Sequence, residues 1–192
     1  WTGLPATVLT GEKEKKTEII KTWKTGALIA SYDSIKRTNK STTDYLTAVI
    51  EQKPEGLILD EAHRIQNRTT ANAKMAFELA EHIPYRLALT GTPTPNKPHT
   101  IWSILHFLYP KKFASYWKFV EEYFYTCLRP AQNGRKFKDI GDLKPYKVKD
   151  MHFILSQIAT QRKRKDVMDW LPEQEPPTRV LLPPTTLQQR YL

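Results

Sequence analysis

Two adjacent acids, Asp60 and Glu61, follow a short run of branched apolar residues in the segment GLILDEAH, residues 56–63. At the end of a buried strand the two carboxylates would repel each other, and a divalent cation would remove that repulsion. The first can hold Mg²⁺, often through water, while the second stays free to accept a proton from an attacking water. The alternative makes Asp60 a helix cap and Glu61 a first-turn carboxylate favoured by the helix dipole.

A second polar turn ends the next apolar run, in LALTGTPTPN at residues 87–96. Gly91 permits a tight turn, and Thr90 and Thr92 offer hydroxyls to His63 or to phosphate-bound water. The alternative is a simple turn in which the prolines end the strand.

The elements that must position these residues alternate along the chain. Short β-rich runs lie at residues 6–10, 27–32, 56–60 and 85–90. Amphipathic or polar segments that suit helices lie between them, at residues 12–24, 42–52 and 69–83. In the last of these, one helix face would carry Ala73, Ala76, Phe77 and Ala80.

This alternation predicts an α/β fold built from βαβ units. Runs such as GLIL show no polar alternation, which is typical of parallel strands covered by helices on both faces of the sheet. Right-handed crossovers would bring the strand ends to one edge of the sheet, where ligands bind in such folds.

The chain after residue 97 changes character twice. Residues 99–110 and 113–128 hold ten of the 21 aromatic residues. The preferred interpretation is a helical core, with a base-stacking platform as the alternative, because apolar residues recur at helical spacing at Phe113, Trp117, Val120 and Phe124.

Residues 129–165 carry eleven Lys and Arg against three Asp. The first part of this basic segment, residues 129–150, is rich in turn-forming residues and is predicted to be a loop. Its charge suggests contact with phosphates, and a solvated loop is the alternative. The proline-rich tail from Leu171 is predicted to be a linker.

Charge and composition narrow the class of partner. The 30 Lys and Arg outnumber the 20 Asp and Glu, which favours nucleic acid over other partners. An anionic membrane is the rival, but no apolar run approaches the roughly 20 residues that span a bilayer. The single Cys127 cannot form an internal disulfide, so we expect an intracellular protein, cytoplasmic in a prokaryote or virus and nuclear in a eukaryote. The first residue is Trp1 and not Met, so we also expect a piece of a longer protein.

Together the motifs resemble helicase superfamily 2, and within it the Swi/Snf-like group of double-stranded DNA translocases. LILDEAHRIQN is like the group's Walker B motif, LALTGTPTPN is like its third motif, and ALIASYDSIKR resembles the segment before Walker B. The aromatic segments resemble its helical protrusion, and QRKRKDVMDWLPEQ resembles the stretch that joins its two lobes. DEAH-box RNA helicases typically have a Ser-Ala-Thr third motif in place of TGTP.

The resemblance implies an incomplete RecA-like P-loop NTPase lobe with an aromatic helical insertion. By resemblance, Asp60 would organise Mg²⁺ and Glu61 would activate the water that attacks the γ-phosphate of ATP. His63, Thr90 and Thr92 would couple the nucleotide site to DNA, with Gly91 also beside the nucleotide. For Arg64 a surface ion pair is the alternative to a DNA contact. The expected DNA contacts are Ser31, Tyr32, Arg64, Arg135, Lys136 and Lys138.

The resemblance also predicts the domain organisation. Residues 1–96 would form the C-terminal part of the first ATP-binding lobe, residues 97–170 the protrusion and basic segment, and residues 171–192 the entry into the second lobe. No Gly is followed by Lys, so the GxGKT phosphate loop is absent, as are the adenine-contacting Gln segment and the second lobe. We therefore expect about half an ATPase, whose sheet lacks an internal strand.

Two functions remain open at this point. The first is part of an ATP-dependent motor that moves on double-stranded DNA, works with the second RecA-like lobe of the same protein and remodels protein–DNA complexes. The second is a nucleotide-independent basic DNA-binding module in which the acids are structural.

Overall fold

The computed structural model describes residues 3–35, 44–94, 97–130 and 135–162. The chain divides into two compact units, Trp1–Met151 and His152–Leu192. The linker expected from Leu171 lies outside the described residues, as does most of the joining stretch 161–174. The domain boundaries expected at residues 96 and 170 remain predictions.

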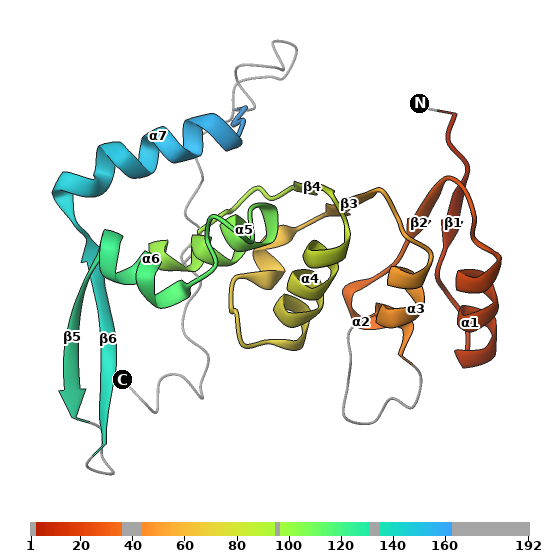
Figure 1. The fold of residues 1–192 in the computed structure, drawn as a ribbon, viewed down its shortest axis with the longest axis horizontal. Helices are drawn as coiled ribbons and strands as arrows, with labels where there is room; N and C mark the ends of the chain where they lie inside the picture. Colours follow the sequence, from red (N-terminus) through yellow and green to blue (C-terminus); the bar gives the residue numbers. More distant parts are fainter. Residues whose placement is uncertain (1–2, 36–43, 95–96, 131–134, 163–192) are drawn as a thin grey trace, which may run out of the picture. The chain divides into compact units, whose positions relative to one another are not determined.

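The first unit contains two pairs of parallel strands, which confirms the α/β class (Figure 1). One pair is β1 (Ala6–Val8) with β2 (Ala27–Ile29), and the other is β3 (Gly56–Leu59) with β4 (Tyr85–Ala88). The connections are helical, through α1 (Lys13–Thr22), α2 (Tyr32–Ile35), α3 (Tyr45–Glu51), the 3₁₀ turn η1 (Ala62–Ile65) and α4 (Ala71–His82). Among the described residues, β2 and β3 are not paired with each other.

Local chemistry explains where these elements begin. Thr70 caps α4 by accepting a hydrogen bond from the Ala73 N–H at 3.3 Å, and Asp44 caps α3 in the same way through the Thr47 N–H. Before β2, Gly26 has a φ of 82°, and a Cβ there would lie 2.1 Å from the Pro5 carbonyl oxygen. Only glycine fits that approach.

The hydrophobic core lies between the strands and helices α1, α3 and α4. Buried side chains from each element meet there, and α4 contributes the alanine face that its spacing predicts, with Phe77 partly buried beside it. Representative core residues are Ile20, Leu46, Leu59, Ile65, Ala73, Ala76, Leu79, Ala80 and Ile83.

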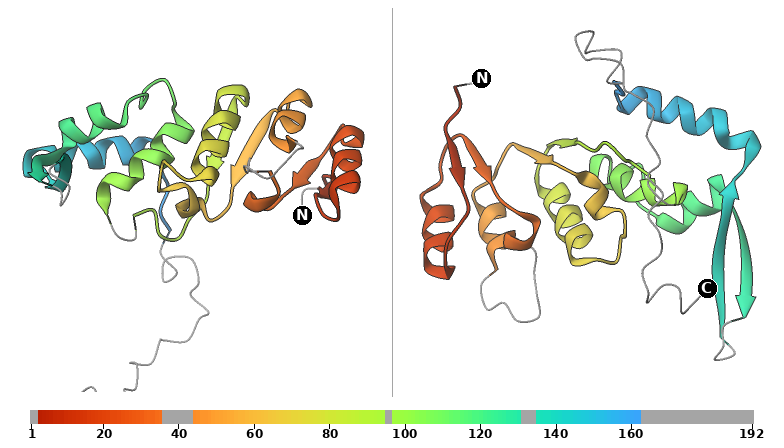
Figure 2. Two further views of the ribbon diagram at one scale, coloured as in Figure 1. Left: turned by 90° about the horizontal axis from the view of Figure 1, so that it is seen from below. Right: turned by 180° about the vertical axis from the view of Figure 1, so that it is seen from behind.

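The expectation of helices on both faces of the sheet is wrong for the described residues. Figure 2 shows α1, α3 and α4 along one side of the strands. The paired residues Val8 and Ile29 on the other side are 54% and 52% exposed, and the paired residues Ile58 and Leu87 are 63% and 49% exposed. One sheet face therefore presents apolar side chains to solvent.

The aromatic region is largely a helical core, as expected. It contains the 3₁₀ turn η2 (Pro98–Thr100), α5 (Ile101–Leu108) and α6 (Tyr116–Tyr123). Phe113 and Phe124 are buried but flank α6, and Val120 within it is fully buried. Trp117 is the exception, because it is 40% exposed.

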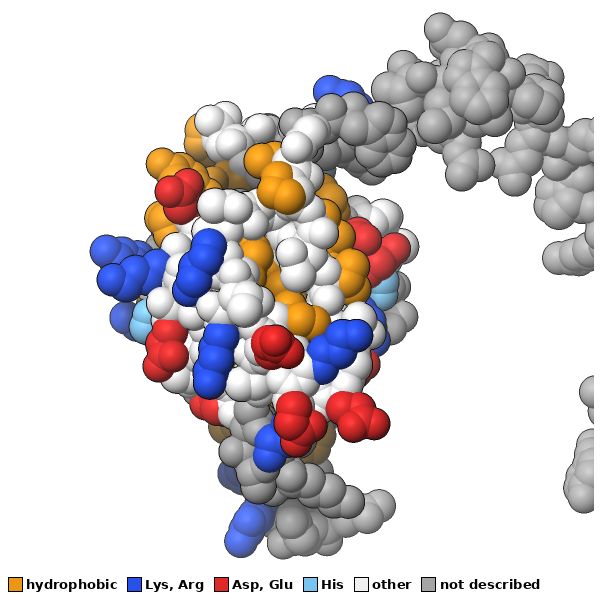
Figure 3. All heavy atoms as spheres, turned by 90° about the vertical axis from the view of Figure 1, so that its right-hand side faces the viewer, with side chains coloured by type: hydrophobic (Ala, Val, Ile, Leu, Met, Phe, Trp, Pro, Cys, Tyr) orange, Lys and Arg blue, Asp and Glu red, His pale blue; other side chains and the backbone are white. Residues whose placement is uncertain are grey.

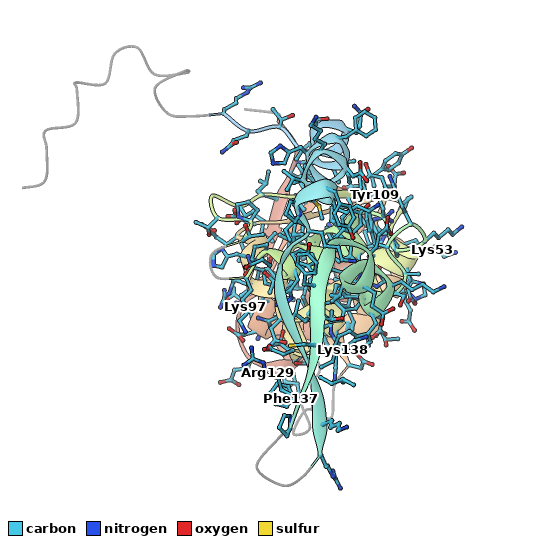
Figure 4. All side chains as sticks on the ribbon, turned by 90° about the vertical axis from the view of Figure 1, so that its left-hand side faces the viewer. Lys53, Lys97, Tyr109, Arg129, Phe137 and Lys138 are labelled. Atoms are coloured by element: carbon cyan, nitrogen blue, oxygen red, sulfur yellow. The ribbon has the colours of Figure 1, made fainter. Side chains whose placement is uncertain are left out.

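The loop predicted at residues 129–150 is wrong for the described part of that range, and residues 131–134 lie outside the described residues. Within the described residues, β5 (Phe124–Pro130) and β6 (Lys136–Leu143) pair as an antiparallel hairpin, shown in Figure 4 with Arg129, Phe137 and Lys138 projecting from it. The 3₁₀ turn η3 (Pro145–Lys147) and α7 (Val148–Ile158) follow. Within the described part of the chain, no helix is long and apolar enough to cross a membrane.

Candidate functional site

The two acids lie where β3 leaves the core. Asp60 and Glu61 are both exposed, and the Asp60 carboxylate accepts a hydrogen bond from the Glu61 N–H at 2.9 Å. Glu61 has left-handed backbone angles, φ 48° and ψ 49°, and its side chain makes no capping bond to η1. Such a conformation is uncommon outside glycine and costs about 1 kcal/mol. Neither side chain therefore makes a capping bond to η1, which argues against the cap that the structural alternative assigns to Asp60.

Backbone hydrogen bonds hold the end of β3 against the end of β4. The Leu89 N–H donates to the Leu59 carbonyl, and the Ala62 N–H donates to the Leu89 carbonyl, both at 2.8 Å. The acids and the TGTP turn therefore lie at the same edge of the parallel pair, as the motif order predicts. Within the turn, the Thr92 N–H donates to the Thr90 hydroxyl at 3.2 Å.

Gln66 is a residue of this site that the sequence did not single out. Its side-chain amide donates to the carbonyls of Pro93 at 2.7 Å and Thr92 at 3.3 Å. Its own carbonyl accepts a hydrogen bond at 2.9 Å from the hydroxyl of Ser103, a buried polar residue of α5. The segment after the acids thus fixes both the TGTP turn and the first aromatic helix. No local sequence signal marks Gln66, because the two carbonyls that its amide binds lie 26 and 27 positions along the chain.

Tyr32 joins the end of β2 to the acids. Its hydroxyl donates to the Asp60 carbonyl at 2.8 Å, and the Arg64 guanidinium lies 5.3 Å from its ring centre. Burial raises the pKa of Tyr32, Asp60 and Glu61 raise it further, and Arg64 opposes them. The phenol therefore stays protonated and can keep donating. Among the described residues Arg64 forms no ion pair, so the surface ion pair considered for it is not formed, and its DNA contact remains a prediction.

Two other predicted residues have local roles in the described structure. The Ser31 hydroxyl lies 2.9 Å from that of Ser34 and accepts the Ser34 N–H at 3.2 Å, at the start of α2. His63 Nδ1 lies 3.1 Å from Glu61 Oε2. In the described part of the chain, His63 makes no hydrogen bond to the hydroxyls of Thr90 or Thr92, so the contact that the sequence suggested is not formed.

The basic hairpin is partly neutralised by acids. Lys138 forms an ion pair with Glu121, and its ammonium lies 5.3 Å from the centre of the partly exposed Trp117 ring. The hydrogen bond from Lys138 is the main reason that the pKa of Glu121 is lowered. Arg129 Nε lies 2.7 Å from Asp139 on the opposite strand. Of the predicted DNA contacts in this segment, Arg135 and Lys136 are exposed.

The carboxylates after β3 suit a Mg²⁺ site in which water and phosphate oxygens supply most of the ligands. Among the described residues, no group of three or more His, Cys, Asp or Glu side chains converges as a metal cage. Mg²⁺ in nucleotide sites usually has one or two carboxylates, with water and phosphate oxygens completing its coordination. An exposed Asp60 at the sheet edge fits that pattern, and it does not fit a structural zinc site.

Comparison with known proteins identifies relatives of this sequence. The family described as the SNF2-related domain matches residues 1–191. The chain is 35% identical over 131 residues to the chromatin-remodeling ATPase INO80 of Cryptococcus neoformans, covering 65% of this chain and 7% of that protein. It is 33% identical over 169 residues to the probable ATP-dependent DNA helicase CHR23 of Arabidopsis thaliana, covering 84% and 14%.

Two further comparisons complete this set. The chain is 30% identical over 181 residues to the ISWI chromatin-remodeling complex ATPase ISW1 of Saccharomyces cerevisiae, covering 91% of this chain and 14% of that protein. A solved structure, the Sulfolobus solfataricus SWI2/SNF2 ATPase core in complex with dsDNA, is 29% identical with a TM-score of 0.48, and the match covers 63% of this chain and 23% of that one. The family match extends over nearly all the residues, so the chain belongs to the SNF2-related domain family.

Proposed function

We propose that this chain is part of an ATP-dependent motor that translocates on double-stranded DNA and remodels protein–DNA complexes. The observation that carries the proposal is the position of Asp60 and Glu61. Both acids are exposed at the carboxyl edge of β3, beside the TGTP turn, with Glu61 in a strained left-handed conformation. A strained residue at such an edge supports a functional role for its side chain. The named activities of the ATPase relatives support the same reaction.

In this proposal Asp60 holds Mg²⁺ and Glu61 is the general base. Mg²⁺, when bound with ATP, neutralises charge that develops on the transferred phosphoryl group. Glu61 accepts the proton of the attacking water, because its carboxylate is exposed and makes no capping bond. Tyr32 and Gln66 are positioning residues, since one holds the main chain at Asp60 and the other holds the TGTP turn. Thr90, Gly91 and Thr92 form that turn beside the nucleotide.

His63 is the residue proposed to relay the state of the nucleotide to DNA. It lies against Glu61 and is 39% exposed at its side chain, so it is accessible from the site. The proposed DNA contacts are Ser31, Tyr32 and Arg64 near the acids and Arg135, Lys136 and Lys138 on the hairpin. Since Lys138 already pairs with Glu121, its contribution to DNA binding is expected to be the smallest of the three hairpin residues.

The chain supplies only part of the proposed machine. No Gly in the sequence is followed by Lys, so the residues that would cradle the β- and γ-phosphates are not in this chain. The chain also spans only 7% to 14% of the lengths of the three curated relatives named above. We therefore expect residues 1–192 alone not to hydrolyse ATP, and the full-length protein to do so with DNA stimulation. In a eukaryotic cell the proposed place of action is the nucleus.

The test uses two conservative variants of the full-length protein. Glu61→Gln keeps the shape of the side chain and should leave ATP binding intact while single-turnover hydrolysis falls by roughly 10² to 10⁴. Asp60→Asn should also weaken Mg²⁺-dependent nucleotide binding, because the lost charge belongs to the metal site.

Melting temperature provides the control for these variants. If the acids were structural, both substitutions would lower stability and activity would fall only with the folded fraction. A Glu61→Gln protein that melts normally and hydrolyses ATP at the parent rate would refute the proposed base.

A further inference from the structure

Tyr116, the first residue of α6, contacts two segments that lead away from the candidate site. The guanidinium carbon of Arg68 lies 4.3 Å from the centre of its ring, and its hydroxyl lies 3.0 Å from Nδ1 of His99. Arg68 belongs to the segment after the two acids, and His99 lies in η2, after the TGTP turn. One side chain of the aromatic region therefore joins the segments that follow the two motifs of the site.

Both contacts are made to segments that hydrogen bonds hold in place. Arg68 lies two residues after Gln66, whose amide binds the TGTP turn. The 3₁₀ turn that carries His99 is closed by Thr100, whose N–H and hydroxyl donate to the Lys97 carbonyl at 3.0 Å and 2.7 Å. A shift of either segment therefore changes the contacts of the phenol ring between them.

The bond between Tyr116 and His99 joins two neutral rings. Burial raises the pKa of Tyr116, against the charge and hydrogen bond of Arg68, so the hydroxyl stays protonated at neutral pH. Burial lowers the pKa of His99, with Lys97 adding to the effect. The imidazole is therefore neutral at the same pH and has one nitrogen that accepts a hydrogen bond.

His99 also contacts the first residue of the β5–β6 hairpin. The ring centres of His99 and Phe124 lie 6.0 Å apart with their planes at 87°, an edge-to-face arrangement. Phe124 is 1% exposed, and Phe119 of α6 packs on it with 5.9 Å between ring centres. The base of the hairpin therefore packs on the same 3₁₀ turn that Tyr116 contacts.

Hydrogen bonds tie the hairpin to the end of α6. Figure 1 shows α6 beside the base of the hairpin, and β5 begins at Phe124, directly after Tyr123, the last residue of α6. Beyond β6, the Lys144 N–H donates to the Tyr123 carbonyl at 2.8 Å, and the Lys144 ammonium donates to the Glu121 carbonyl at 2.6 Å. Helix α6 and the hairpin therefore form one connected arm that begins at Tyr116.

The hairpin end of this arm presents basic side chains. Arg135 and Lys136 are exposed there, and clustered positive charge attracts a polyanion. The surface around α1 and β1 differs, because Figure 3 shows Asp and Glu side chains among its Lys and Arg side chains. Among these surfaces, the arm is the better suited to a phosphate backbone.

We infer that Tyr116 is a positioning residue through which DNA contact at the hairpin promotes ATP hydrolysis at the acids. DNA bound to the hairpin fixes the arm, and the arm orders the segments of Arg68 and His99 through the packed aromatic side chains. Those segments continue into the chain that carries the two site motifs. The inference rests on the proposed function, because it names the residue that couples the two proposed activities.

Tyr116→Phe tests this coupling in the full-length protein. The variant keeps the ring against Arg68 and Trp102 but removes the hydroxyl that reaches His99. We expect the DNA-stimulated kcat to fall by roughly fivefold or more, since coupling between sites begins at about that size. The rate without DNA and the Kd for duplex DNA should stay near the parent values. A purely structural role would instead lower both rates together with the folded fraction.

Tyr123→Phe is the matched control for the lost hydroxyl. Tyr123 is a buried phenol of the same helix, and its ring contacts the Lys147 ammonium. This variant should keep the full stimulation by DNA. Equal losses of stimulation in Tyr116→Phe and Tyr123→Phe would overturn the role of the bond to His99.

Variants of His99 test the other end of the bond. His99→Leu removes the partner of the phenol and should lose at least as much stimulation as Tyr116→Phe, whereas His99→Gln keeps an acceptor and should lose less. The double variant of Tyr116→Phe and His99→Leu should lose no more than His99→Leu alone, because both changes remove the same bond. Additive losses would contradict the coupling through this pair.

DNA affinity gives a readout that does not require hydrolysis. Coupling between two binding sites is reciprocal, so a non-hydrolysable ATP analogue should change the Kd for duplex DNA in the parent and change it less in Tyr116→Phe. Equal changes in the two proteins, including none, would overturn the inference. A parent that hydrolyses ATP with DNA stimulation equal to that of Tyr116→Phe would overturn the inference and leave the proposed function standing. A full-length parent without ATP hydrolysis would overturn both.

Discussion

The side-chain amide of Gln66 donates to the Pro93 carbonyl at 2.7 Å, which links the segment after the two acids to the TGTP turn. We predict that Gln66→Ala in the full-length protein slows single-turnover ATP hydrolysis by roughly tenfold, because a small misplacement of catalytic groups is costly. Gln66→Lys restores a donor and should recover most of the rate, whereas Gln66→Glu should not. Equal rates in the Ala and Lys variants would show that the amide does not position the turn.

Arg86 binds the ends of two helices from its place on β4. Its guanidinium donates to the carbonyls of Ala80 and Ile83 at the end of α4 and to Leu108 at the end of α5. We predict that Arg86→Met lowers the free energy of unfolding by about 2 to 4 kcal/mol, since several charge-assisted hydrogen bonds are lost. Urea unfolding measures the change.

A lysine variant controls for charge in the Arg86 experiment. Arg86→Lys keeps the positive charge but loses the planar fork that reaches several carbonyls at once. It should recover less than half of the stability lost in Arg86→Met. Full recovery would mean that charge alone matters at this position.

The aromatic core should lose stability in mild acid because of two histidines. Burial lowers the pKa of His99, with Lys97 adding to the effect. The ring of His106 stacks on that of Trp102, with 4.6 Å between the ring centres. Burial also lowers the pKa of His106, although the hydrogen bond to the Phe113 carbonyl and the charge of Glu81 act to raise it. Both histidines therefore bind protons less readily when folded than when unfolded.

Their contribution to stability is fully present above the unfolded pKa of about 6.5 and is lost as pH falls through the lower folded pKa. We predict a melting temperature that declines from pH 6.5 downward. His106→Phe keeps an aromatic ring and should make the decline shallower. An unchanged slope in that variant would assign the acid sensitivity to other groups.

The hairpin should contact DNA unequally along its length. Replacing Arg135 and Lys136 together with Ala should flatten the slope of log K against log salt on duplex DNA by about 1.8, if each residue neutralises one phosphate. Lys138→Ala should change the slope less, because Lys138 pairs with Glu121. A larger effect from Lys138 than from the other two would reverse the proposed DNA path.

The parallel strands and the polar residues at their ends are the parts that the sequence predicts well. GLIL and YRLA are short β-rich runs, each followed at once by polar residues, so their ends could be placed from local pattern. The bond between Tyr32 and Asp60 and that between Gln66 and Pro93 join residues 28 and 27 positions apart. Such contacts depend on how the strands pair, and no local pattern encodes them.

The β5–β6 hairpin and the exposed apolar face of the parallel strands are the two features that local sequence pattern predicts wrongly. The hairpin strands contain Lys, Asp, Gly and Pro, which favour a loop, but cross-strand pairs such as Arg129 with Asp139 stabilise them. The apolar run GLIL predicts cover on both faces, while Ile58 is 63% exposed in the described structure. Apolar residues on both faces of a strand show that both faces can be buried. Whether a face is buried depends on whether another segment packs against it.

The exposed row of Val8, Ile29, Ile58 and Leu87 also has a consequence for handling the isolated chain. Apolar strands with open edges template aggregation, and mutual repulsion from the net charge of +10 opposes it. That repulsion acts over only about 8 Å at physiological ionic strength and about 3 Å at 1 M salt. Residues 1–192 should therefore remain dispersed in dilute buffer and precipitate as salt is added, the opposite of a chain whose sheet is fully covered.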